Sequence, residues 1–232
     1  AFSVLTDKTP AGEEGQMLSV ARMTHPIFTE SKFGFVFTNG DPTGLTDNTV
    51  AGADFQYRNS NIFGDKVLQA DVYYMKSFSS TAGDDESAAF SLNFPNEPWS
   101  GDFVFKQIGA DFTPALGFVN RAAMRQYTGT VAHLSRYRSS WLNTLEFGTN
   151  FDFFTDLGNV LESRANDVLV RVRTRVGDFV TFRVVNSFEN VPVRFFRPRT
   201  VAIPAGPYDW TNLNVGGRTF NGRLFTVQAA VT

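Results

Sequence analysis

The stretch DVLVRVRTRVGDFVTFRVVNSF, residues 167–188, decides the fold of this chain. Apolar residues alternate along it with charged or polar ones, and side chains two residues apart lie on the same face of a β-strand. One face of the first half carries Val168, Val170, Val172 and Val176, and the other carries Leu169, Arg171, Arg173 and Arg175. In the second half, Val180, Phe182 and Val184 oppose Phe179, Thr181, Arg183 and Val185. Gly177–Asp178 is a two-residue connection typical of a tight hairpin. The stretch therefore predicts two antiparallel strands, each with two distinct faces.

The same period of two recurs along the rest of the chain. It is clearest in 31–39, where Phe33, Phe35 and Phe37 share one face, and in Lys66–Ser77. Further expected strands are Met17–His25, Thr49–Arg58, Ser87–Phe94, Gly101–Ile108, Met124–Leu134, Leu142–Thr155, Pro192–Ile203, Tyr208–Gly216 and Gly222–Val231. Many of them are about ten residues long, against ~5–6 in a typical soluble strand. We therefore expect an all-β fold, an antiparallel up-and-down barrel or an open part of one, with roughly a dozen long strands.

The composition supports this fold and excludes several kinds of function. The 232 residues include 25 Phe, 19 Gly and 10 Pro, but no Cys and only two His. The chain therefore has no disulfide, no cysteine-bound metal and no thiolate chemistry, and two His argue against a multi-histidine metal site, so we expect no cofactor. A net charge of −2 gives no overall attraction to nucleic acid. Since no linker or repeat interrupts the pattern, residues 1–232 are expected to form a single β-barrel domain, a piece of a larger barrel.

Alternation alone does not decide whether such a sheet is soluble or spans a membrane. A strand tilted across a bilayer needs only ~9–11 residues, with every second one apolar. The expected strands are long enough, and aromatic residues stand near strand ends, as at interfaces of membrane barrels. These aromatics are Tyr73, Tyr74, Trp99, Trp141, Tyr208 and Trp210. The pattern favours a transmembrane barrel; the alternative is a soluble β-sandwich or small barrel that packs its aromatics at its edges.

Arginines form the most prominent charge pattern. Arg171, Arg173 and Arg175 lie on one strand face, and Arg183 follows on the next strand. In a barrel they would form a basic wall that faces the lumen and attracts anionic solutes. The other interpretation is that they pair with Asp or Glu of neighbouring strands and only fill the lumen.

Four segments carry a resemblance to a known family. They are Leu18–Arg22 (LSVAR), Thr49–Phe55 (TVAGADF), Gln107–Arg121 (QIGADFTPALGFVNR) and Val201–Trp210 (VAIPAGPYDW). Their order resembles the β-barrel domain of unknown function of bacterial outer-membrane proteins, which usually follows an N-terminal domain like carbohydrate-binding module family nine. One motif of that family is matched by Ile108, Gly109, Asp111, Phe112, Pro114, Gly117, Phe118, Val119 and Arg121, and another by Ile203, Pro204, Gly206, Tyr208 and Trp210. The resemblance implies an internal or C-terminal portion of such a barrel in the outer membrane, and it supplies neither a catalytic residue nor a substrate.

The segment Gly109–Arg121 also has a physical interpretation. Gly109 and Gly117 permit backbone shapes that other residues resist, and Pro114 interrupts strand pairing. Asp111 can cap a turn, while Phe112 and Phe118 can hold the excursion against the barrel. We expect an ordered loop, either a shaped turn needed only for folding or a constriction in the lumen.

Catalytic arrangements are weak in this sequence. His25 and His133 stand at strand ends, and no nucleophile elbow accompanies them. The carboxylates Asp54, Asp71, Glu146 and Asp152 could serve a glycosidase only if they met in pairs. Asp41–Asp47 and Asp84–Glu86 offer oxygen ligands for calcium but lack the EF-hand pattern.

We therefore expect a non-enzymatic outer-membrane barrel in contact with lipid, which handles or passes saccharide-type or other small solutes and binds no nucleic acid. Its oligomeric state is left open. A soluble glycan-binding module and a cell-surface carbohydrate-active enzyme are the alternatives.

Overall fold

The computed structural model describes residues 1–6, 15–193, 195–196, 202–222 and 226–231, and every regular element in them is a β-strand. The long strands are β2 (Met17–Ile27), β3 (Ser31–Asn39), β4 (Asn48–Ile62), β5 (Lys66–Ser79), β6 (Asp85–Phe94), β7 (Trp99–Ile108), β8 (Met124–Arg136), β9 (Leu142–Asp156), β10 (Leu161–Thr174), β11 (Phe179–Val191) and β14 (Gly206–Arg218). The short strands are β1 (Phe2–Leu5), β12 (Phe195–Phe196), β13 (Ala202–Ile203) and β15 (Gln228–Val231). This part of the chain contains no helix that could cross a membrane.

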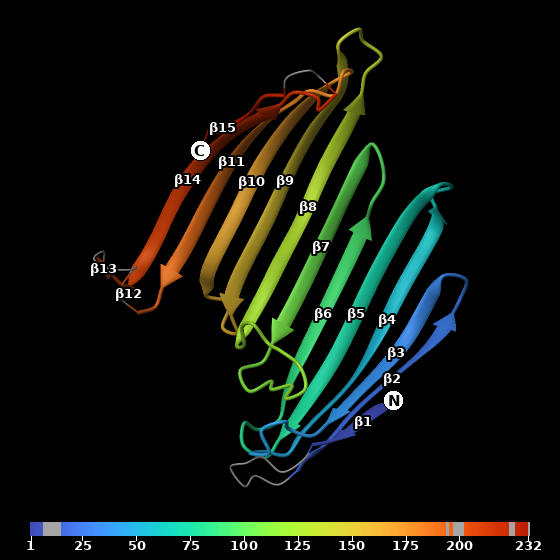
Figure 1. Cartoon of the computed structure of the whole chain (residues 1–232), viewed down its shortest axis with the longest axis vertical. Coiled ribbons are helices and arrows are strands. Elements are labelled where there is room, and N and C mark those ends of the chain that lie inside the picture. The colour runs from blue at the N-terminus through green and yellow to red at the C-terminus, as the bar shows by residue number, and fades with distance from the viewer. Residues whose placement is uncertain (7–14, 194, 197–201, 223–225, 232) are drawn as a thin grey trace. The chain divides into compact units, whose positions relative to one another are not determined.

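Thirteen strands form one antiparallel sheet in the order of the chain, and β12 pairs separately with β13 (Figure 1). The all-β, up-and-down arrangement predicted from the sequence is therefore confirmed. The sheet order begins with β1 and ends with β15, and no pairing joins these two strands within the described residues. The sheet is thus open, and closure into a barrel is not observed.

Contacts along the chain group the residues into two compact units. Unit 1 consists of residues 1–93 and 104–126, and unit 2 of residues 94–103 and 127–232. Each unit is described by itself below.

Several strands differ in length from the sequence prediction. β10 begins at Leu161, six residues before the alternating stretch, because its pairing with β9 and β11 extends into residues that do not alternate. The strand predicted at Pro192–Ile203 is replaced by the short pair β12 and β13, with residues 194 and 197–201 outside the described part. The strand predicted at Gly222–Val231 is reduced to β15, and residues 223–225 are likewise outside it.

In unit 1 the pairing register sorts the side chains onto two faces. Phe35 pairs with Met23 and Ala53, and Val72 with Phe55 and Phe90, so these side chains share one face. Phe35, Phe37, Val72 and Phe90 are exposed on this face, which we call the apolar face of unit 1. Its polar face carries Arg22, Thr24, Lys32, Asp54, Gln56, Asp71, Tyr73 and Ser91.

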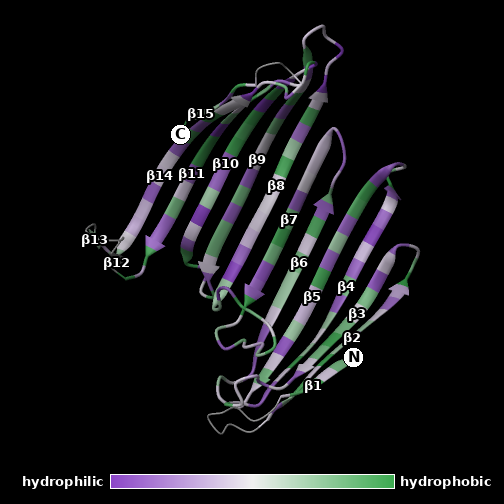
Figure 2. Ribbon diagram, viewed as in Figure 1, coloured by the Kyte–Doolittle hydropathy of each residue, from purple (hydrophilic) through white to green (hydrophobic). Residues whose placement is uncertain are grey.

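Unit 2 has the same division. Its apolar face carries Val168, Val170 and Val172 of β10, paired with Val184, Phe182 and Val180 of β11. Val168 and Phe182 are 45% and 46% exposed. The polar face of unit 2 carries Asp167, Arg171, Arg173, Thr181, Arg183 and Ser187. Figure 2 shows the resulting alternation of hydrophilic and hydrophobic residues along the strands.

The hydrophobic core is very small. Only Val50, Ile108, Phe112, Met124, Leu169 and Val191 are buried hydrophobic residues in the described chain. Apolar side chains of a soluble domain are normally buried in far greater number. Most apolar side chains of these strands are therefore at least partly exposed.

Candidate functional site: the polar faces of the sheet

An ion pair crosses three strands on the polar face of unit 1. The Arg22 guanidinium of β2 reaches Asp54 of β4 through two hydrogen bonds, one of them 2.8 Å long from Nη2 to Oδ1. It passes over β3 at Gly34, which pairs with Thr24 on one side and Asp54 on the other. A Cβ at Gly34 would lie 2.5 Å from Nη2 of Arg22 and 2.8 Å from Oδ2 of Asp54. Gly34 is therefore the residue that lets this ion pair form.

The same face contains a hollow of about 510 Å³. Polar and charged side chains that line it are Arg22, Asp54, Gln56, Asp71, Tyr73, Ser91 and Lys106. Ser91 Oγ lies 3.3 Å from Asp71 Oδ2, and the Tyr73 hydroxyl lies 3.2 Å from Ser87 Oγ. Charges of both signs therefore surround a space that can hold water or a small polar solute.

In unit 2 the predicted arginine pattern lies on the polar face, opposite the valines. Arg171 Nη1 donates to Glu146 Oε2 over 2.9 Å, and its Nε donates to Thr181 Oγ1 over 3.3 Å. Arg183 Nε lies 3.8 Å from Asp167 Oδ1, which also accepts a 2.8 Å hydrogen bond from Asn150 Nδ2. Arg171 and Arg183 thus have carboxylate partners on neighbouring strands.

Arg173 and Arg175 differ from these two. Both are exposed, and no acidic group in the described part of the chain lies within ion-pair distance of them. Arg173 lies in the register row of Phe179, and Phe179 pairs with Arg218, whose guanidinium lies 6.0 Å from the Phe179 ring centroid. Two arginines without an ion-pair partner among the described residues therefore lie at this end of β10, next to the turn that contains Asp178.

The segment Gly109–Arg121 folds over one end of the polar face of unit 1. Thr113 N donates to Ser77 Oγ over 3.2 Å, and Asp111 N donates to Asp85 Oδ2 over 2.8 Å. Asn48 Nδ2 donates to Thr113 O over 2.6 Å, and Asn48 Oδ1 accepts the Ala115 N–H over 3.0 Å. Three side chains from β4, β5 and β6 therefore hold the backbone of the segment in place, and Ser77 has no exposed surface.

The motif residues of this segment have different surroundings. A Cβ at Gly109 would lie 2.0–2.2 Å from the Asp85 carboxylate, so only glycine fits beside this anchor. Phe112 is buried, whereas Phe118 is 86% exposed. Gly117 N donates to Pro114 O over 2.8 Å and closes a turn. Asp111 is exposed and Arg121 is half-buried.

The loop between β3 and β4 is organised by Asp41 rather than open for a metal ion. Asp41 Oδ1 accepts the Thr43 N–H over 2.9 Å, and Oδ2 accepts the hydroxyls of Thr43 and Thr46 over 2.7 and 2.9 Å. These hydrogen bonds lower the pKa of Asp41 below its ordinary value. The largest contribution comes from the Thr43 N–H, and smaller ones come from the hydroxyls of Thr43 and Thr46. In the described chain no group of three or more His, Asp or Glu is placed to hold a metal ion.

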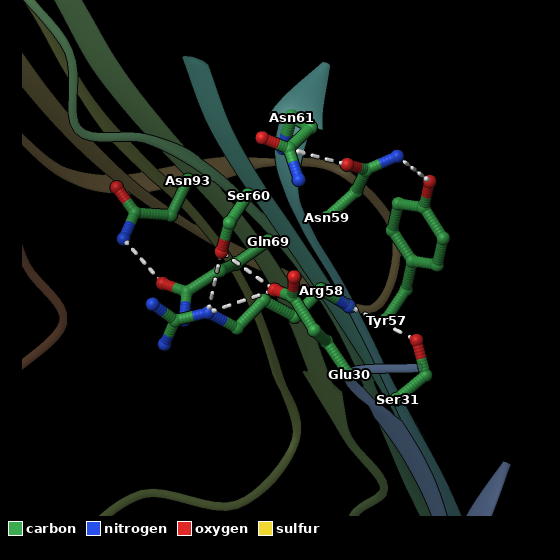
Figure 3. Close-up of polar contacts among 9 residues, drawn as sticks. All are labelled: Glu30, Ser31, Tyr57, Arg58, Asn59, Ser60, Asn61, Gln69 and Asn93. Carbon is green, nitrogen blue, oxygen red and sulfur yellow. Dashed lines mark hydrogen bonds and ion pairs between the residues drawn. The ribbon is translucent and has the colours of Figure 1, made fainter. Parts of the chain in front are cut away.

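A polar network lies at the other end of β4, where the β2–β3 and β4–β5 turns meet (Figure 3). Ser60 Oγ donates to Glu30 Oε2 over 2.6 Å, and Arg58 Nε lies 3.5 Å from the same oxygen. Arg58 N donates to Ser31 Oγ over 3.2 Å. The network therefore joins the two turns.

Three of the residues considered for catalysis have defined partners in the described part of the chain. Asp54 and Glu146 are each bound to an arginine. His133 Nδ1 lies 3.3 Å from Ser135 Oγ, and its ring lies 4.5 Å from Trp99, but none of its hydrogen bonds in the described chain reaches a carboxylate. These neighbours give His133 no acidic residue to orient it.

Three of the aromatic residues predicted for a membrane interface lie on the polar faces of the sheet instead. Tyr73 lies in the middle of β5 on the polar face, paired with Asp54 and Ala89. Tyr208 and Trp210 pair with Glu189 and Ser187, which also places them on the polar face of unit 2. Along β14 they alternate in step with Asn212 and Asn214, so the sequence alone could have placed them on the polar face.

Comparisons with known proteins do not assign this chain. None of the protein-family models, curated proteins or solved structures matches it.

Proposed function

We propose that this chain is part of an outer-membrane β-barrel that has no catalytic role and lets small polar solutes enter or pass along its polar face. The observation that supports the proposal is the exposed apolar face of each unit, opposite a polar face that carries cross-strand ion pairs. Water penalises this arrangement, whereas a barrel in lipid requires apolar residues outside and polar residues in the lumen.

The height of the apolar surface supports the same proposal. On the apolar face of unit 2, β10 is apolar between Asn166 and Thr174, and β11 between Asp178 and Asn186, a span of eight residues in each strand. We call these surfaces the apolar band. At ~3.4 Å per residue the span is about 27 Å along the strand, or about 21 Å along the membrane normal at a tilt of ~40°. On β5 of unit 1 the band runs from Lys66 to Lys76, or about 26 Å along the normal. Membrane barrels have an apolar band ~25 Å tall.

Ion pairs on the polar faces fit a narrow aqueous lumen. Arg22–Asp54, Arg171–Glu146 and Arg183–Asp167 each join different strands. Each of these charged groups faces an opposite charge on another strand. The lumen would then favour polar solutes over apolar ones.

Cysteine accessibility tests the proposal directly, since the chain has no cysteine of its own. Single variants Val168→Cys and Phe182→Cys report on the apolar band, and Thr181→Cys reports on the polar face between them. In lipid vesicles a water-soluble maleimide should label Thr181→Cys at least tenfold faster than the two band variants. The same reagent should label all three variants after unfolding in denaturant, which controls for reactivity.

The alternatives predict other results. A soluble glycan-binding module or a soluble enzyme would stay monodisperse without detergent, and its exposed Val168→Cys would react as fast as Thr181→Cys. Either result refutes the membrane proposal.

A further inference from the structure

The polar face of unit 2 contains a second hollow, at the end of the strands opposite the arginines. It has a volume of about 250 Å³ and is lined by residues of β9, β10, β11 and β14. Two register rows build it. One row runs Asp152, Ala165, Ser187, Trp210, and the next runs Phe154, Ser163, Glu189, Tyr208.

The floor and walls of the hollow have different chemistry. Ser163, Ala165 and Ser187 are the small residues on the two central strands, β10 and β11, and form the floor. Phe154 and Trp210 stand on the outer strands β9 and β14. Adjacent strands are ~4.8 Å apart, so these aromatic walls are about 14 Å from each other at the backbone. This separation leaves space for one small ring between them.

Trp210 is unusual on a polar face. It is 44% exposed, and its indole N–H donates to no described residue. An aromatic surface next to serine hydroxyls and a carboxylate suits a ligand that has both a C–H face and polar edges. Tryptophan is large and amphipathic, and its exposure here fits contact with such a ligand.

Hydrogen-bonding groups around the hollow indicate which ligand fits. The hydroxyls of Ser163 and Ser187 are half-buried and have no hydrogen-bond partner in the described part of the chain. Serine hydroxyls both donate and accept, and the carboxylates of Glu189 and Asp152, which both line the hollow, accept strongly from hydroxyl groups. Arg164 also borders the hollow, and its Nη2 donates to Asn186 and Asp209 on the apolar face.

We propose that this hollow binds one ring of a neutral saccharide, with a C–H face of the ring against Trp210 and its hydroxyls bonded to Glu189, Ser163 and Ser187. The volume is below the ~300–1,000 Å³ of pockets for drug-sized ligands, as one ring requires. An organic cation would use Trp210 and the carboxylates of Glu189 and Asp152, but it would leave the O–H donors of the two serines without an acceptor, since an ammonium group only donates. The inference rests on the proposed function, because the polar face must be open to solutes.

Tryptophan fluorescence can test this site. The chain has three Trp, so Trp99→Phe and Trp141→Phe together leave Trp210 as the only reporter. The protein is titrated in amine-oxide micelles, which carry no sugar headgroup, with maltose, with the open-chain polyol mannitol and with choline. Maltose should change the emission of Trp210 with saturation, and mannitol and choline should not. Glu189→Gln in the same background should weaken maltose binding about tenfold, or ~1.4 kcal/mol, whereas Asp65→Asn in the β4–β5 turn should leave it unchanged.

A linear response to maltose, an equal response to mannitol, or saturation by choline instead of maltose would each overturn the saccharide site. If the double Trp variant does not fold, calorimetric titration of the wild-type chain and the Glu189→Gln variant with maltose measures the same difference in affinity. The titration needs no passage through a membrane. Its failure, together with maleimide labelling that supports the membrane proposal, would remove the saccharide site alone.

Discussion

Arginine substitution in the apolar band gives the most direct energetic test of the fold's environment. Val170 lies midway between Asn166 and Thr174 and is flanked in the register by Phe147 and Phe182. In a bilayer this position is close to the midplane, where arginine costs about 2–4 kcal/mol in a membrane barrel. We expect Val170→Arg to lower the free energy of unfolding by that amount, a factor of roughly 30–1,000 in the folded-to-unfolded ratio.

Val176→Arg is the matched control, because Val176 lies in the turn after β10 and is already exposed. Near an interface the same change should cost about 0–1 kcal/mol. Urea unfolding in phosphatidylcholine vesicles, followed by tryptophan emission, measures both variants. Equal effects within ~0.5 kcal/mol would refute the reasoning, because a surface substitution in water is nearly neutral wherever it stands.

Three further predictions concern single contacts. Gly34→Ala should displace Arg22 from Asp54 and destabilise unit 1 by about 1 kcal/mol in urea unfolding; an unchanged midpoint would show that the pair contributes nothing there. Gly109→Ala should push away the Asp85 carboxylate and raise the rate of proteolysis within residues 109–123 by about tenfold. The control Gly216→Ala, where the nearest atom lies 3.7 Å from the new Cβ, should leave that rate unchanged. Hydrogen bonds lower the pKa of Asp41 in the folded state, so they stabilise its loop fully above the unfolded pKa of ~3.9, and this stabilisation is lost as the pH falls through the lower folded pKa. Amide exchange of Thr43 should therefore accelerate on acidification. Asp41→Asn should abolish this effect of pH on the exchange rate.

Alternation within each strand was readable from the sequence, and pairing between strands was not. The parity of Arg171 and Val170 predicts that they lie on opposite faces of one strand, as the structure has them. The partner Glu146 is 25 residues away from Arg171, and nothing local marks it as the one opposite. Register between strands depends on where each turn ends, and a sequence alone leaves that undetermined.

The segment Gly109–Arg121 shows the same limit. Its glycines and proline predict irregular backbone, and the structure has no strand there. Its anchors Asn48, Ser77 and Asp85 are 26–67 residues distant in the chain. Each is an ordinary polar residue near a strand end, so only the folded sheet reveals that they meet around this segment. Trp210 was assigned to a membrane interface because it is near a strand end. Its position in the alternation of β14, which places it on the polar face, was given less weight.

Gly34 has a consequence for how the sheet assembles. Its neighbours along β3 are Phe33 and Phe35, so a slip of that strand by one position would put a phenyl ring under the Arg22 guanidinium. The ion pair between Arg22 and Asp54 would then be blocked, and the phenylalanine side chains of β3 would lie on the polar face. The Arg22–Asp54 ion pair can therefore form only when β3 is in the correct register with β2 and β4. The absence of a side chain at Gly34 thus favours one register among three neighbouring strands.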